Sequence, residues 1–159
     1  RNMTRRILWL VALLSGCGLS PPATLSVSYD FSPEQRATVL DARDAWCEAV
    51  GWCPLPSERG EGRILLVDDL GDSGLCAGCK RGAHNYGNGI TEVARNVMGD
   101  DLGILWLLVA HEMGHYCSLT GGTDDHGHTS TGLMAAIQRR DGPLEIDQSA
   151  IDAWRDGCD

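Results

Sequence analysis

The chain has 159 residues, 43% of them hydrophobic, and its 22 acidic residues against 13 Lys and Arg give a formal net charge of −9. This length allows one domain with a proper core and leaves little room for two. An acidic protein of this kind repels nucleic acids and anionic lipid headgroups. We therefore exclude nucleic acid as a partner and expect any membrane contact to depend on a lipid anchor.

The N-terminal segment has the pattern of an export signal. Arg5 and Arg6 precede an apolar stretch from Ile7 to Leu14, which is too short to cross a bilayer. The sequence from Leu14 to Cys17, Leu-Ser-Gly-Cys, resembles the lipobox of bacterial lipoproteins, in which cleavage falls before the cysteine and its thiol is lipidated. The alternative is an ordinary signal peptide cut near Ser20.

This pattern divides the chain into three parts. Residues 1–16 are the expected lipoprotein signal peptide, residues 17–24 hold the lipidated Cys17 and a short tether, and residues 25–159 form the domain. The expected location is the bacterial cell envelope, with the protein held by lipid, or otherwise the secreted fraction. Several acyl chains are needed for stable anchoring, because each methylene contributes only about 0.8 kcal/mol.

The domain is predicted to begin with a strand and a long helix. Leu25 to Tyr29 alternates apolar and polar residues, as a half-buried strand does. Ser32 is a helix N-cap followed by Pro33 at the first helical position and Gln35 three residues on, which is a capping box. The helix should run to about Val50, with Trp46 on its apolar stripe.

Two more strands are expected before the most apolar segment. Arg63 to Asp68 contains a continuous apolar run that suits a strand covered on both faces of a sheet. The glycine-rich stretch from Gly71 to Gly89 is expected to be loop. Ile90 to Ala94 alternates again and predicts an edge strand, which could pair with an extended substrate.

The sequence His111-Glu112-Met113-Gly114-His115 is an H-E-x-x-H motif at the end of a long apolar run, from Leu102 to Ala110. Asp101, before this run, is suited to a helix N-terminus. Residues four apart share one helix face, so His111 and His115 can hold one metal ion, with Glu112 beside a bound water. The alternative is a buried core helix whose histidines only satisfy hydrogen bonds.

A catalytic zinc site usually takes a third protein ligand. The candidates after the motif are Asp124, Asp125, His126 and His128, and either aspartate could instead orient a ligating histidine. The chain then predicts a C-terminal helix from about Asp147, its cap, to Trp154. Strands followed by helices indicate an α+β fold.

The motif region resembles the metzincin zinc metalloproteases, most closely small matrixin-like enzymes of bacteria. In that family H-E-x-x-H-x-x-G-x-x-H supplies three zinc histidines, and a downstream methionine, the Met-turn, forms an apolar floor beneath the metal. His111, Glu112, Gly114 and His115 match, as does Met134 in the later segment Gly-Leu-Met-Ala.

The resemblance implies a small zincin-like α+β domain, with a twisted mixed sheet, an N-terminal helix, an active-site helix and a C-terminal helix. His126 lies eight residues before Met134, a separation similar to that in matrixins, so it is the favoured third ligand and His128 the alternative. Ser118 and Gly121 stand where the family has its glycine and its third histidine, as if five residues were inserted.

Six cysteines follow Cys17, and an even number in an exported protein indicates disulfides. Their spacing favours three pairs: Cys47 with Cys53, Cys76 with Cys79, and Cys117 with Cys158. A structural zinc held by Cys76 and Cys79, with His84 nearby, is the alternative for the middle pair.

These features together predict a zinc-dependent endopeptidase, with one catalytic Zn²⁺ ion and Glu112 as general base. Its expected partner is a protein or peptide substrate, and the chain is expected to be a monomer. Two alternatives stay open. A gluzincin-type peptidase would take Glu145 as its third ligand, and a non-catalytic surface lipoprotein would bind zinc through four protein ligands without turnover.

Overall fold

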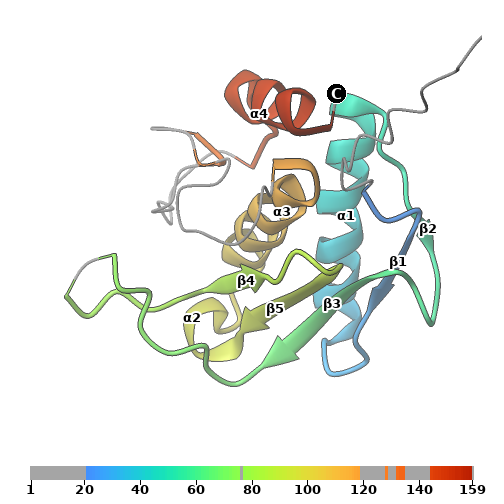
Figure 1. The fold of residues 1–159 in the computed structure, drawn as a ribbon. Coiled ribbons are helices and arrows are strands. Elements are labelled where there is room, and N and C mark those ends of the chain that lie inside the picture. The colour runs from blue at the N-terminus through green and yellow to red at the C-terminus, as the bar shows by residue number, and fades with distance from the viewer. Residues whose placement is uncertain (1–20, 76, 119–127, 129–131, 135–143, 159) are drawn as a thin grey trace, which may run out of the picture.

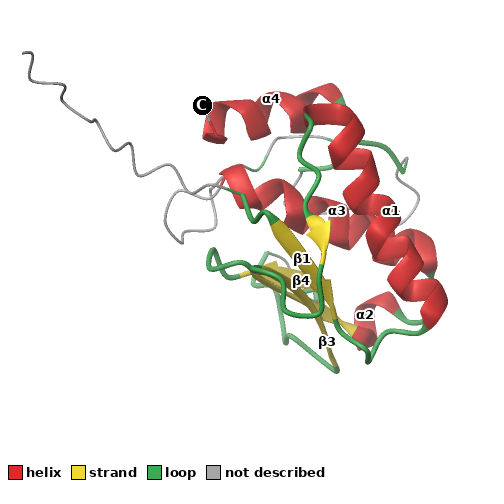
Figure 2. Ribbon diagram, turned by 90° about the vertical axis from the view of Figure 1, so that its right-hand side faces the viewer, coloured by secondary structure: helices red, strands yellow, loops and turns green. Residues whose placement is uncertain are grey.

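The computed structural model describes residues 21–75, 77–118, 128, 132–134 and 144–158. The elements in chain order are β1 (Thr24–Val27), α1 (Pro33–Val50), β2 (Leu55–Pro56), β3 (Gly62–Val67), β4 (Ala83–Asn85), β5 (Ile90–Ala94), α2 (Arg95–Met98), α3 (Leu102–Ser118) and α4 (Gln148–Cys158). Helices α1 and α3 pack on one face of the sheet, and α4 packs on α3 on the side away from the sheet (Figures 1 and 2). The predicted α+β class is confirmed.

The sheet is mixed and has the order β2-β1-β3-β5-β4. Only β4 runs antiparallel to its neighbour, β5. The predicted edge position of Ile90 to Ala94 is therefore wrong, because β5 lies between β3 and β4. The edge strand on this side of the sheet is β4, inside the stretch predicted to be loop, and β2 is the edge on the other side. Three strand residues among glycines are too few for a periodic pattern, and glycines with positive φ, Gly87 and Gly89, turn the chain from β4 into β5.

Helix α1 forms as its sequence predicts. The Ser32 hydroxyl accepts a hydrogen bond from the Gln35 backbone amide, and the Gln35 side chain accepts one from the Ser32 amide, which completes the capping box. Gly51, with a φ of 78°, ends the helix in the left-handed conformation. Trp46 is fully buried, as predicted for a core residue.

Strand β3 is covered on one face only, contrary to the prediction for Arg63 to Asp68. Ile64 and Leu66 are buried towards the helices, whereas Arg63 is exposed and Leu65 and Val67 are half-buried. The continuous apolar run was misleading, because the structure leaves its alternate residues on the outer face of the sheet. The helices thus gather on one face, and that is where the core lies.

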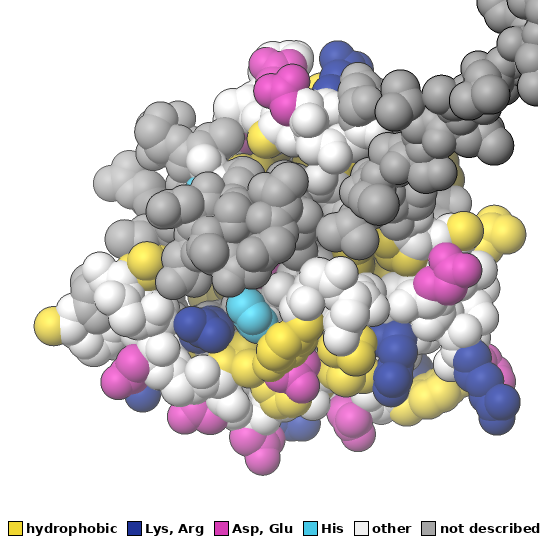
Figure 3. Space-filling model, in the orientation of Figure 1, with side chains coloured by type: hydrophobic (Ala, Val, Ile, Leu, Met, Phe, Trp, Pro, Cys, Tyr) yellow, Lys and Arg dark blue, Asp and Glu magenta, His cyan; other side chains and the backbone are white. Residues whose placement is uncertain are grey.

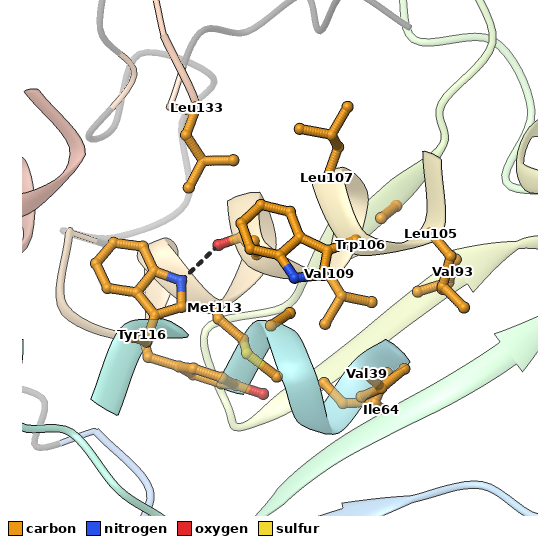
Figure 4. Close-up of a cluster of buried hydrophobic side chains, with 14 of the residues drawn as sticks. Val39, Ile64, Val93, Leu105, Trp106, Leu107, Val109, Met113, Tyr116 and Leu133 are labelled. Atoms are coloured by element: carbon orange, nitrogen blue, oxygen red, sulfur yellow. Dashed lines mark hydrogen bonds between the residues drawn. The ribbon is translucent and has the colours of Figure 1, made fainter. Parts of the chain in front are cut away.

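Helix α3 passes through the centre of this core. Asp101 accepts hydrogen bonds from the backbone amides of Gly103 and Ile104, at 2.9 and 3.1 Å, and so caps the helix as predicted. Leu105, Val109 and Met113 are fully buried between the sheet and α1 (Figure 4). Such a helix holds its histidines rigidly, because interior packing is dense.

Two disulfides join predicted pairs. Cys47 in α1 bonds with Cys53, which follows the helix, and Cys117 bonds with Cys158, which ties α3 to the end of α4. Cys79 is also disulfide-bonded, which does not favour a role as a thiolate zinc ligand, while Cys76 lies outside the described residues.

The expected signal peptide (residues 1–16) and Cys17 lie outside the described residues as well. Among the described helices, none has the length and hydrophobicity that a membrane crossing requires.

Candidate metal centre

Three histidines meet on the surface of α3. His111 and His115 lie one helical turn apart and bring their Nε2 atoms to 3.1 Å. His128, which follows the helix in sequence, packs its ring 5.2 Å from that of His111 and 4.8 Å from that of His115. One ring nitrogen from each residue lies within 4.8 Å of the others, an arrangement that could hold a metal ion.

Hydrogen bonding fixes the orientation of His111. Its Nδ1 lies 2.7 Å from the Leu133 carbonyl oxygen. A carbonyl can only accept, so Nδ1 carries the proton and Nε2 keeps its lone pair for the cluster. The Leu133 amide in turn donates to the Asp147 carboxylate at 2.6 Å. The peptide of Leu133 is thus held from both sides, and its carbonyl is aimed at His111.

Burial keeps the two helical histidines neutral. It lowers the pKa of His111 to about 4 and that of His115 to about 2. The positive charge that either ring would gain cannot be solvated in the core, and neighbouring imidazoles would repel it. Neutral imidazole is the form that binds metals, so the site has ligands ready near neutral pH.

Glu112 lies between the two histidines in sequence and is buried. Burial raises the pKa of its carboxyl to about 8, although the Asn85 backbone and the charge of Arg81 act in the opposite direction. A carboxyl with such a pKa can take up and release a proton near neutral pH. It has the chemistry of a general acid and base.

Met134 lies against α3 at Gly114. A Cβ atom on Gly114 would come within 2.8 Å of the Met134 methyl carbon, closer still to its sulfur, and 3.1 Å from the Trp46 ring. Met134 is 1% exposed, and Trp46 donates from Nε1 to the Ala110 carbonyl at 2.9 Å. Glycine at position 114 therefore leaves room for the Met134 side chain against α3, one residue before His115.

The structure brings together His111, Glu112, His115 and Met134 as the sequence predicts. The third histidine of the cluster is His128, the alternative at the sequence level. His126, the favoured candidate, lies outside the described residues, as do Asp124 and Asp125. Glu145 is exposed, and among the described residues it is not part of the cluster.

Three contributors to the site were missed at the sequence level. They are the Leu133 carbonyl, the Asp147 carboxylate and the Asn85 side chain, which donates to the Glu112 carbonyl at 3.0 Å. Asp147 was predicted as a helix cap, and it does accept from the Ala150 amide at 3.1 Å. No local pattern signals its second bond, because Leu133 is fourteen residues away.

On β4, His84 is half-buried between the buried residues Ala83 and Asn85. Figure 3 shows a histidine side chain on one face of the molecule, between a cationic side chain and a group of hydrophobic ones.

No protein-family model matches this sequence, and the comparison with curated proteins gave no match either. The function is therefore inferred from the residues of this centre.

Proposed function

We propose that the chain is a zinc-dependent endopeptidase. The observation that supports this proposal most is the cluster of His111, His115 and His128 with Glu112 beside it on the same buried helix. H-E-x-x-H on a helix is the ligand and base arrangement of zinc peptidases. The Met134 floor and the α+β fold agree with the metzincin-like resemblance, which stays a proposal.

The donor set suits zinc. Zinc binds imidazole nitrogen at about 2.0 to 2.1 Å in tetrahedral sites, which puts two ligating nitrogens about 3.3 Å apart. The observed 3.1 Å between the Nε2 atoms of His111 and His115 is close to that separation. A metal-ligating histidine commonly donates a hydrogen bond from its other ring nitrogen to a backbone carbonyl, which fixes the ring orientation. His111 does this from Nδ1 to the Leu133 carbonyl.

Three protein ligands leave one position open, which distinguishes catalytic from structural zinc. When bound there, zinc would polarise the scissile carbonyl and acidify a water molecule. Glu112 then takes the proton from the attacking water and passes it to the nitrogen of the leaving amine. Burial raises the pKa of the Glu112 carboxyl, which favours uptake of the proton from water.

An extended peptide has a place to bind beside this centre. Strand β4 is the last strand of the sheet, and an extended chain can add to such an edge through backbone hydrogen bonds. We propose that the substrate is an unfolded or extended protein segment lying along β4. Export and lipid anchoring through Cys17 also stay proposals, and the disulfides agree with an oxidising compartment.

The test is cleavage by the purified domain, residues 18–159, of an unfolded protein, read by mass spectrometry. Glu112→Gln keeps the shape of the side chain and removes the base, so it should bind zinc and show no hydrolysis. Glu145→Ala is the matched control and should cleave like the wild type. Equal cleavage by wild type and Glu112→Gln would sink the proposal, and loss of zinc in Glu145→Ala would favour the gluzincin alternative.

A further inference from the structure

Two buried side-chain contacts join β4 and β5 to α3, and the Tyr116 hydroxyl also donates to the Gly89 carbonyl in the turn between these strands, at 3.4 Å. The Asn85 side chain on β4 donates to the Glu112 carbonyl at 3.0 Å, and the hydroxyls of Thr91 on β5 and Tyr116 lie 3.3 Å apart. Asn85 and Thr91 are paired directly across the two strands. Glu112 and Tyr116 are four residues apart on one helix face. The two contacts therefore join the same pair of strands to the same face of α3, one at the proposed base, Glu112, and one a helical turn later, at Tyr116.

The Asn85 side chain uses both halves of its amide. Its nitrogen donates to Glu112, and its oxygen accepts from the Gly87 backbone amide at 2.8 Å. The residue is 5% exposed. Aspartate at this position would keep the acceptor and lose the donor, whereas leucine would lose both. Asparagine is the residue of this size that can link the turn after β4 to the helix.

We propose that Asn85 is a positioning residue that holds the edge strand β4 in register with Glu112. This inference rests on the proposed function and deepens it. A peptide that adds to β4 takes its position from that strand, whereas the proton acceptor belongs to α3. The Asn85 contact joins strand and helix at Glu112 itself, so it sets the spacing between the scissile bond and the base.

A change in that spacing would affect turnover more than binding. A peptide can still add to a β4 strand that has shifted on the helix, because strand addition uses the backbone of β4. The peptide would then lie out of line with Glu112, and a misplacement of about 1 Å can cost on the order of a hundred-fold in rate. The expected signature is a lower kcat with KM nearly unchanged.

The test compares Asn85→Leu and Asn85→Asp with Thr91→Val in the zinc-loaded domain. Thr91→Val removes the second contact from the same hairpin and is the matched control for general loosening. Each variant is assayed for kcat and KM on a peptide cleaved by the wild type, for zinc content, and for thermal stability. Asn85→Asp retains the hydrogen bond from the Gly87 amide, so it replaces Asn85→Leu in the comparison if that variant does not fold.

We expect both Asn85 variants to bind one zinc per chain and to lose about ten- to a hundred-fold in kcat. Thr91→Val should keep kcat within about threefold of the wild type, with a similar loss of thermal stability. Equal kcat in the Asn85 and Thr91 variants would overturn this inference and leave the proposed function intact. A wild type that cleaves nothing would overturn both.

Discussion

The metal centre draws on two regions that the fold secures in different ways. His111 and His115 belong to a helix packed on every side by the core, and helical periodicity alone brings their nitrogens together. His128 follows the helix, and the nearby Leu133 and Met134 are held by hydrogen bonding to Asp147 and by packing on Gly114. A short motif can specify the first region, whereas the second depends on contacts between distant segments.

The largest effect is expected from removing a helical ligand. His115→Ala deletes a nitrogen that no neighbour in α3 can replace. Zinc content should fall well below one per chain, and hydrolysis should drop by more than about a hundred-fold, the upper range for losing only a supporting residue. Metal analysis after dialysis, with peptide cleavage, checks this. Full zinc content in His115→Ala would show that the metal is held elsewhere.

The third ligand can be identified by a pair of variants. His128→Ala should lose zinc and activity nearly as fully as His115→Ala, because the described cluster contains His128. His126→Ala should then retain most of both. The reverse result would restore the ligand favoured by the sequence, and loss of zinc in both variants would indicate a site with four protein ligands.

Gly114→Ala should disturb the floor of the site. The new methyl group would be forced against Met134 and Trp46, and overpacking of this kind costs about 1 to 3 kcal/mol. Urea unfolding measures the free energy of unfolding. Gly103→Ala is the control in the same helix, since its Cβ would meet only the Asp101 carboxylate, at 3.2 Å. Similar destabilisation by the two variants would argue against tight packing at Gly114.

The smallest effect concerns the anchor of the second region. Burial acts to raise the pKa of Asp147, but hydrogen bonds from Ser149 and from the Leu133 and Ala150 amides together hold it below the ordinary 3.8. The stability that this carboxylate contributes is present above pH 3.8 and is lost as the pH falls through the lower, folded-state pKa.

Asp147→Asn should therefore cost about 1 kcal/mol near neutral pH, because the hydrogen bonds that the carboxylate accepts are charge-assisted and those to an amide oxygen are not. The difference from the wild type should shrink below pH 3.8. Unfolding measured across the acidic range checks this, and a difference that does not change with pH would assign the effect to packing.

The comparison of the two regions also explains what could be read from the sequence. Helix α1 with its Ser32 cap, helix α3 with its histidines, and the Cys47–Cys53 and Cys117–Cys158 disulfides follow from local patterns and spacing. Strand β4 and the hydrogen bond from Asn85 were missed, because a three-residue strand among glycines has no period and its pairing is set by β5.

The rank of His126 over His128 came from spacing relative to Met134. The number of residues between a ligand and Met134 is a weak guide where residues are inserted, because tertiary contacts set the path of the inserted chain. The structure adds one such contact, the stacking of His128 on His111 at 5.2 Å, which no sequence pattern indicates.

The most direct test of the catalytic zinc centre is X-ray absorption spectroscopy at the zinc edge of the wild-type domain loaded with one zinc per chain. We expect three imidazole nitrogens at about 2.0 to 2.1 Å and one oxygen ligand that exchanges with added inhibitor. Four protein ligands and no exchangeable oxygen would contradict a catalytic centre and indicate a site in which zinc only holds the fold.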